Sequence, residues 1–144
     1  MPQRPVRRII ENQRIVAVPP TTTVAEAARV MKNSKFSALP VVDKQRLIGI
    51  FTERDALFRV LAVGRDPITT PVASVMTHNP QTTQPDRPFG HALHLMYEGG
   101  FRHVPVTEHG RLVGMVSARD VLGPELEEFA SEMQTREHIG EILG

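Results

Sequence analysis

The chain contains one stretch of sequence twice. The segment FSALPVVDKQRLIGIFTERDAL begins at Phe36, and FRHVPVTEHGRLVGMVSARDVL begins at Phe101, 65 residues later. The two segments align without a gap, and the same register extends back to Val18 and Thr83. Chance does not produce such a match. The repeat therefore predicts two copies of one structural unit.

Composition excludes several classes of protein. The chain has 144 residues, the length of about one ordinary domain. With 40% hydrophobic and 23% charged residues it is typical of a globular protein, and the absence of cysteine excludes disulfide scaffolds and thiolate zinc sites. The longest apolar runs, such as residues 15–18, are far shorter than the roughly 20 residues of a membrane span, and the N-terminus lacks the pattern of a secretory signal. We expect a cytoplasmic protein that binds neither a membrane nor nucleic acid, because its net charge is only +1.

Each copy has the pattern strand, helix, strand, strand, helix. A helix is expected after Thr23, a plausible N-cap, because apolar residues then recur at helical spacing. The other elements of the first copy are strands at residues 15–18, 39–42 and 47–51 and a helix at 52–61, and the second copy repeats the order over 81–122. We predict an α+β fold of two β-α-β-β-α repeats related by a pseudo-twofold axis. The predicted boundaries are 8–63, 72–123 and a C-terminal tail at 124–144, with a linker through residues 64–67 and 70–71.

The sharpest local motif lies at a junction between a strand and a helix. It reads GIFTERD from Gly49 to Asp55 and GMVSARD from Gly114 to Asp120. A hydroxyl at a helix start lies beside free backbone N–H groups, which favour a phosphate, and an arginine offers forked donors to the same group. An ionised aspartate can accept two hydrogen bonds from a ribose diol. The glycine removes a side chain where a ligand or neighbouring backbone could approach.

The same residue pattern has a second interpretation that needs no ligand. A hydroxyl residue followed three positions later by an acidic residue is typical of a capping box, which satisfies the first N–H groups of a helix. A structural cap would be duplicated with the rest of the unit. Duplication therefore leaves both interpretations open.

The two motif copies resemble the tandem cystathionine-β-synthase (CBS) domain pair, or Bateman module, over about residues 8–122. The resemblance implies two nucleotide sites in clefts between the repeats, with the hydroxyl on phosphate and the aspartate on ribose. By position, these residues are Thr52 and Asp55 in one copy and Ser117 and Asp120 in the other, with Arg54 and Arg119 as added phosphate donors. Residues ahead of the strand prolines match positions that contact base or phosphate: Ser37, Ala38, Arg102 and His103. Val16 and Gln81 match the contact from the first strand.

The implied ligand is an adenine nucleotide, most simply AMP, with ATP, ADP, NAD(H) and S-adenosylmethionine as rivals. No cofactor is required for such a role, and any output passes to an unidentified effector protein. The first strand of the second copy, residues 81–83, is more polar than residues 15–18, so we expect the two sites to bind unequally. The alternative function is a structural dimerisation module whose clefts carry no ligand.

Metal and enzyme interpretations are weaker. His91 and His94 stand one helical turn apart, but their counterparts in the first copy indicate an exposed face and no third ligand is near in sequence, so we expect no metal site. Ser117 and His103 could meet, yet the first copy has no histidine at the matching position. We expect no enzymatic activity, since no base–nucleophile pair is built in both copies.

Apolar helix faces predict self-association. The residues after each motif are more apolar than one small unit can cover, which predicts a homodimer: Ala56, Leu57, Val60, Leu61, Val121 and Leu122. The tail beyond residue 123 carries Leu126, Phe129, Ala130 and Met133 on one helical stripe, followed by Ile139, Ile142 and Leu143. Docking on its own chain and docking on a partner subunit are both compatible with this pattern.

Overall fold

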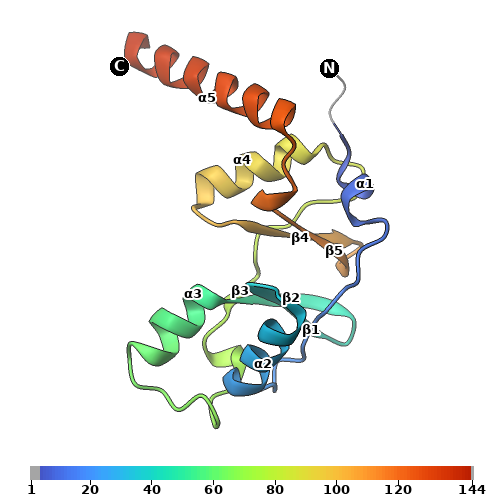
Figure 1. Cartoon of the computed structure of the whole chain (residues 1–144), viewed down its shortest axis with the longest axis vertical. Helices are drawn as coiled ribbons and strands as arrows, with labels where there is room; N and C mark the ends of the chain where they lie inside the picture. The colour runs from blue at the N-terminus through green and yellow to red at the C-terminus, as the bar shows by residue number, and fades with distance from the viewer. Residues whose placement is uncertain (1–3, 144) are drawn as a thin grey trace.

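The structure, a computed structural model, describes residues 4–143, with side chains described for residues 4–136. It has two halves, one for each repeat (Figure 1). The first half contains α2 (Val24–Ser34), β1 (Ala38–Asp43), β2 (Arg46–Thr52), α3 (Glu53–Asp55) and the π-helical segment η1 (Ala56–Leu61). The second half contains α4 (Phe89–Gly99), β4 (His103–Glu108), β5 (Arg111–Ser117), the 3-10 turn η3 (Ala118–Asp120) and α5 (Gly123–Leu143). The predicted α+β fold of two repeats is confirmed.

One sheet joins the two halves. β1 pairs antiparallel with β2, and β4 pairs antiparallel with β5, in the order β1-β2-β5-β4. The two hairpins meet at the pairing of Arg46 with Arg111. Each hairpin turns through two residues with positive φ, Lys44 and Gln45 in the first and His109 and Gly110 in the second. Positive φ at both central residues matches the twist of adjoining antiparallel strands, so both copies form tight turns.

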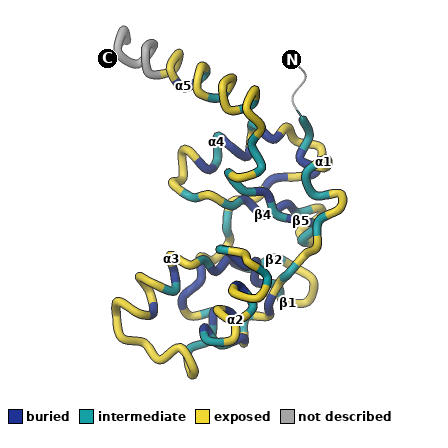
Figure 2. Tube along the Cα trace, viewed as in Figure 1, coloured by how far each residue is buried: buried dark blue, intermediate teal, exposed yellow. Residues whose placement is uncertain are grey.

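Each half has its own hydrophobic core. In the first core, Leu39, Val41 and Phe51 are fully buried against α2. In the second core, Phe89, Val104 and Val116 are fully buried. Figure 2 shows the buried residues as one dark-blue group within each half.

The segment that precedes each repeat packs against the opposite half. Helix α1 (Val6–Ile10) places Val6 in the second core, and the 3-10 turn η2 (Val72–Ser74) places Val72 in the first. Backbone hydrogen bonds fix both crossings, because the Val6 N–H donates to the Arg87 carbonyl at 2.9 Å and the Val72 N–H donates to the Thr22 carbonyl at 2.8 Å. Each core is therefore incomplete without chain from the other side.

The motif glycines make room for these crossing segments. A Cβ at Gly49 would lie 2.9 Å from the Thr77 carbonyl oxygen, and a Cβ at Gly114 would lie 2.7 Å from Ile10 Cγ2. Of the two expected reasons for a glycine, a neighbouring segment is the one observed. In the first half the neighbour is β3 (Thr77–His78), which pairs with β2. In the second half the carboxamide of Gln13 takes this place, donating to the Met115 carbonyl at 2.7 Å and accepting from the Met115 N–H at 2.8 Å.

The expected first strand of each repeat is reduced to a single bridge residue. Val18 pairs in parallel with Val41, and Thr83 pairs with Val106. Val18 donates to the Pro40 carbonyl and accepts from the Val42 N–H, so the next ladder donor would be the residue two positions later. That residue is Pro20 in the first copy and Pro85 in the second. Proline has no N–H, so neither ladder continues past the bridge residue, and residues 15–17 and 81–82 lie outside both ladders.

The closing helix of the second repeat also differs from the prediction. In the first half, helical structure continues from α3 through η1 to Leu61. In the second half, η3 ends at Asp120, and Val121 is extended with φ −67° and ψ 134°. Pro124 has no N–H to donate to the Asp120 carbonyl, as a helix continuing from η3 would require, and the Leu122 N–H donates to the Glu125 carboxylate in a new cap. Helix α5 therefore begins at Gly123.

The first part of α5 packs on its own chain. The ring of Phe129 lies 5.1 Å from that of His94 and 5.9 Å from that of Tyr97, both on α4. Met133 is buried, whereas Leu126 is exposed. Of the two interpretations of the tail, docking on its own body is the one observed for this part. The side chains of Ile139, Ile142 and Leu143 lie outside the described residues.

Candidate functional site

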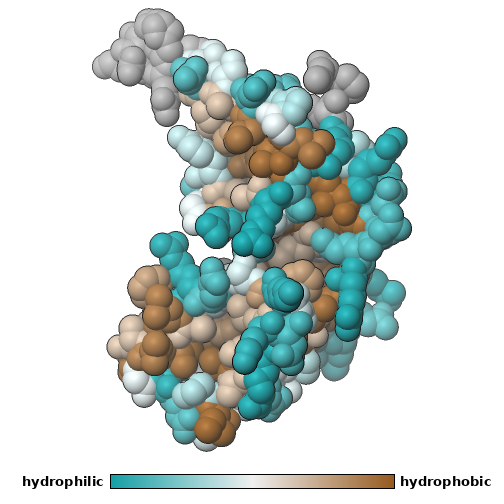
Figure 3. Space-filling model, in the orientation of Figure 1, coloured by the Kyte–Doolittle hydropathy of each residue, from teal (hydrophilic) through white to brown (hydrophobic). Residues whose placement is uncertain are grey.

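Two clefts combine residues from both repeats. The Thr52 cleft, named for its motif hydroxyl, has a volume of about 720 Å³. The Ser117 cleft has a volume of about 250 Å³. Figure 3 shows a notch between the two halves with hydrophilic side chains on its rims.

The Thr52 cleft joins the first motif to the second repeat. Thr52, at the end of β2, and Asp55, in α3, come from the first motif together with Arg54. The opposite wall carries Gln81, with Arg102 and His103 at the start of β4. The remaining lining mixes polar and apolar residues: Ser37, Glu53, Arg59, Thr77, Asn79, Gly99 and Gly100 with Ile50, Pro80 and Phe101.

The Ser117 cleft shows the reciprocal arrangement. Ser117, Arg119 and Asp120 come from the second motif, and Val16, Ser37 and Ala38 from the first repeat. Apolar side chains form much of its wall: Ile15, Phe36, Pro40, Leu112 and Met115. All the residues predicted for the sites line one cleft or the other. The structure brings the two sets together, and their contacts with a nucleotide stay a prediction.

The first motif forms a capping box. The Thr52 N–H donates to Asp55 Oδ2 at 2.9 Å, and the Asp55 N–H donates to Thr52 Oγ1 at 3.2 Å. Asp55 is 7% exposed, and Arg59 Nε lies 3.5 Å from its Oδ1. The capping interpretation is thus correct for the contacts within the motif. Asp55 holds the end of β2 against α3 and still faces the cleft with its neighbours.

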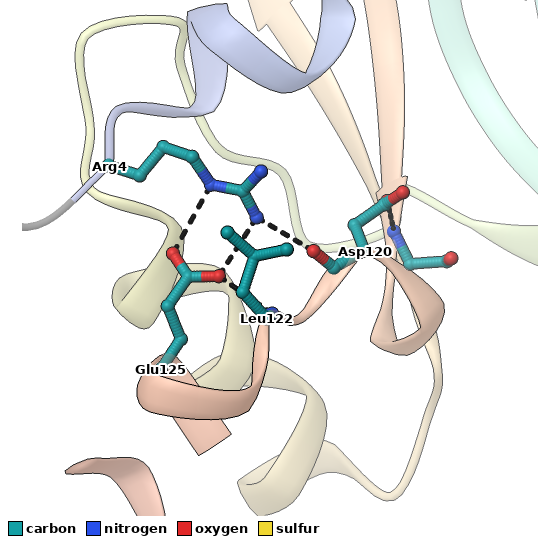
Figure 4. Close-up of polar contacts among 5 residues, drawn as sticks. Arg4, Asp120, Leu122 and Glu125 are labelled. Carbon is teal, nitrogen blue, oxygen red and sulfur yellow. Dashed lines mark hydrogen bonds and ion pairs between the residues drawn. The ribbon is translucent and has the colours of Figure 1, made fainter. Parts of the chain in front are cut away.

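The second motif is tied to both ends of the chain. The Ser117 N–H donates to Asp120 Oδ2 at 2.7 Å, and the Asp120 backbone carbonyl accepts from Arg4 Nη2 at 2.7 Å. The same guanidinium donates two hydrogen bonds to the Glu125 carboxylate of α5, from Nη2 to Oε1 at 2.9 Å and from Nε to Oε2 at 3.2 Å (Figure 4). Arg4 therefore links the backbone of Asp120 to the start of α5.

Exposed cations supply positive charge to both clefts. Arg54 lies with its guanidinium 5.7 Å from the ring of Phe58, and Arg119 is exposed beside Ser117. Arg14 and Lys35 add two more cations to the Ser117 cleft. Guanidinium groups bind phosphate through two parallel hydrogen bonds, so these positions favour an anionic ligand.

His103 and Ser37 are the two residues that line both clefts. Ser37 Oγ lies 3.1 Å from His103 Nε2. Burial lowers the pKa of His103 below its ordinary value, and the neighbouring Arg102 lowers it further. The imidazole is therefore neutral at physiological pH. The candidate pair of His103 as base and Ser117 as nucleophile is not formed, because the His103 ring is hydrogen-bonded to Ser37.

Sequence reasoning missed further lining residues that the repeat register relates. Arg14 and Asn79 are 65 positions apart, as are Ile15 and Pro80, and each pair contributes one member to each cleft. Phe36 and Phe101 do the same. Extending the register four residues before Val18 would have related the first two pairs, and Phe36 and Phe101 already begin the aligned segments.

The histidine pair on α4 has a structural environment. His94 is partly covered by α5, with Nε2 3.0 Å from the Glu132 carboxylate, while His91 is exposed. The expected exposure of His94 is therefore wrong, because α5 covers this face of α4. Within the described part of the chain, no three His, Cys, Asp or Glu residues are grouped so that they could hold a metal ion. No helix in the described range is long and apolar enough to cross a membrane.

Comparisons with known proteins agree with this architecture. A family model for the CBS domain matches residues 6–62 and 72–125. The CBS domain-containing protein CBSCBSPB1 of Arabidopsis thaliana is 41% identical over 109 residues, which are 75% of this chain and 20% of that relative. A hexameric CBS-CP12 protein from bloom-forming cyanobacteria has a TM-score of 0.75 at 29% identity, over 84% of this chain and 67% of that one.

A further solved structure shows the same fold. The CBS domain protein PAE2072 from Pyrobaculum aerophilum, complexed with AMP, has a TM-score of 0.79 at 24% identity, over 88% of this chain and 98% of that one. The family match covers most of the chain and falls once on each repeat, as the internal duplication requires. This protein therefore belongs to the CBS domain family and carries two CBS domains in tandem.

Proposed function

We propose that this pair of CBS domains is a regulatory module that binds an adenine nucleotide, most simply AMP, in the clefts between its repeats. One observation carries the proposal. In each cleft the motif hydroxyl, arginine and aspartate of one repeat face the first-strand and pre-proline residues of the other. The AMP complex of a protein with the same fold supports this choice of ligand.

The Ser117 cleft provides separate surfaces for the parts of a nucleotide. Its apolar wall at Ile15, Val16 and Met115 suits the face of a base. Asp120 offers carboxylate oxygens for ribose hydroxyls. Ser117 and Arg119 offer donors for phosphate. The volume of about 250 Å³ is just under the usual range of ligand pockets, which favours a mononucleotide over a larger ligand.

The two clefts are proposed to bind unequally. The Thr52 cleft is larger, at about 720 Å³, and it has Gln81 and Asn79 where the other cleft has Val16 and Arg14. The larger cleft covers less of an adenine face, and Gln81 stands where the other cleft has the apolar Val16, so AMP binds more weakly there. The Thr52 cleft has the room for the larger rivals ATP, ADP, NAD(H) and S-adenosylmethionine.

Arg119→Gln tests the assignment of the stronger site. Arg119 is exposed and pairs with no carboxylate among the described residues, so the variant should melt like the parent without nucleotide. Hydrogen bonds to a charged group contribute about 1.5–3 kcal/mol, so AMP affinity at the stronger site should fall about tenfold to a hundredfold by calorimetric titration. Arg7→Gln, which removes an exposed arginine that lines neither cleft, is the matched control. Equal loss in both variants would show that only net charge matters.

The proposed role is binding without catalysis. Ser37 and His103 form a hydroxyl–imidazole pair, but no hydrogen bond among the described residues orients the other ring nitrogen of His103, as a nucleophile–base pair in a catalytic site requires. We propose that nucleotide binding changes the module and that this change acts on an effector protein.

We propose that the module is a homodimer. On η1, Leu57, Phe58 and Leu61 are exposed, Leu61 by 73%. Figure 3 shows hydrophobic surface over the region of α3 and η1. A second copy would cover this face, and the hexameric CBS-CP12 protein shows that a related chain self-associates.

Light scattering tests the dimer. At micromolar concentration the expected mass is about 32 kDa, twice the 16.0 kDa of the chain. Leu61→Glu should shift the mass toward that of one chain, because a charge in the interface would lose its hydration. A mass near that of one chain for the unaltered protein would contradict the proposal.

A further inference from the structure

The two clefts are separated by one hydrogen-bonded pair. Ser37 directly precedes β1, and His103 begins β4, so the pair links the start of one hairpin to the start of the other. Both residues line both clefts, and Ser37 Oγ is 3.1 Å from His103 Nε2. An anion entering either cleft therefore has access to the same two donors.

The number of donor protons on this pair depends on the state of His103. A neutral imidazole has one N–H, and a serine has one O–H. One of these two protons makes the bond between them, which leaves a single donor for an anion. A doubly protonated imidazole uses Nε2–H to donate to Ser37 Oγ, and both the serine O–H and Nδ1–H are then free to donate. The neutral pair can thus serve one phosphate, and the protonated pair can serve two.

We propose that the Ser37–His103 pair couples the two nucleotide sites through one proton. While His103 is neutral, a phosphate in one cleft takes the single free donor and weakens binding in the other. When His103 takes up a proton, both clefts have a donor, and the two sites fill with similar affinity. This inference rests on the proposed function and adds to it a pH-dependent coupling between the sites.

The charges around His103 agree with a neutral resting state. Arg102, which directly precedes β4, and Arg119 on η3 disfavour the imidazolium, whereas Glu53 on α3 and Asp120 on η3 favour it. Burial and Arg102 act most strongly, and they lower the pKa of His103. Two phosphates would add negative charge on both sides of the ring. Proton uptake should therefore accompany the second binding step and not the first.

Calorimetric titration with AMP at about pH 8 and about pH 6 tests the coupling. In the unaltered protein, the ratio of the two dissociation constants should be at least about tenfold larger at the higher pH, the usual effect of losing one hydrogen bond to a charged group. AMP itself gains a proton near pH 6, so the comparison is made with His103→Gln, which keeps a neutral polar group. In that variant the ratio should not change with pH. His109→Gln, an exposed turn histidine that lines neither cleft, should behave like the unaltered protein.

A second measurement keeps the test independent of the fold of His103→Gln. Calorimetric titration of the unaltered protein in two buffers of different ionisation enthalpy should show proton uptake with the second AMP that is absent with the first. A ratio that changes equally with pH in the parent and in His103→Gln would overturn the coupling and leave the proposed function intact. A single AMP bound at about pH 6 would also overturn it. Absence of AMP binding at either pH would overturn the proposed function and the coupling together.

Discussion

Replacing Phe51 by alanine is expected to lower the free energy of unfolding by about 3–5 kcal/mol, the usual cost of removing a buried phenylalanine ring. Phe51 is 0% exposed and packs at the centre of the first core, and Phe89→Ala should cost a similar amount in the second. Denaturant titration followed by circular dichroism measures both. Phe36→Ala is the matched control, because Phe36 is 43% exposed and its loss should cost much less.

The same experiment also tests whether the two halves unfold together, because the segment that precedes each repeat packs in the opposite half. Val72 and Met76 complete the first core, while Val6 completes the second. Neither half should therefore unfold alone, and both phenylalanine variants should shift one common transition. A separate early transition in Phe51→Ala would contradict this exchange. A variant as stable as the parent would contradict the placement of Phe51 in the core.

The repeat made most of the fold predictable, because one register relates both hairpins, both first helices and both motifs. Local signals could also be seen for features that the prediction missed. Pro20 and Pro85 lie where each parallel ladder needs its next N–H donor, and Gly123 and Pro124 interrupt the last helix of the second copy. Proline lacks the backbone N–H that a continuing ladder or helix needs, and it restricts the residue before it. The ends of these ladders and of this helix could therefore have been expected from the sequence.

Other features depend on contacts between distant segments. One is the packing of Val72, the first residue of the predicted second unit, in the first core. Two sets of hydrogen bonds join residues more than 100 positions apart: the Gln13 carboxamide with the Met115 backbone, and Arg4 with Glu125. The counterparts of His91 and His94 in the first copy indicated an exposed face, and the covering helix, α5, was not assigned to that side. No local pattern contains such information.

For the candidate site, the sequence selected residues that line the two clefts, but not the contacts that these residues make with one another. Asp55 was expected either to cap a helix or to bind ribose, and the structure shows the capping contacts in place. Asp55→Asn would therefore alter both the cap and the cleft. The exposed arginines separate the two roles better, because the side chain of Arg119 is exposed in the cleft beside the motif.

Nucleotide binding should stabilise the folded protein by a measurable amount. A ligand that binds only the native state adds about 2.7 kcal/mol at a hundredfold excess over its dissociation constant. For a domain of this size the melting temperature should rise by about 2–8 °C. Adenosine keeps the base and the ribose but lacks the phosphate that Ser117 and Arg119 are proposed to bind, so its effect should be much smaller. GMP should also do less, if backbone groups beside Val16 distinguish adenine.

Thermal unfolding of the unaltered protein with and without AMP tests the central claim most directly. The account predicts a rise in melting temperature with AMP that adenosine does not reproduce and that Arg119→Gln largely removes. ATP, NAD(H) and S-adenosylmethionine belong in the same series, because the Thr52 cleft has room for them. If none of these ligands shifts the melting temperature at millimolar concentration, the clefts are not nucleotide sites and the protein is a structural dimerisation module.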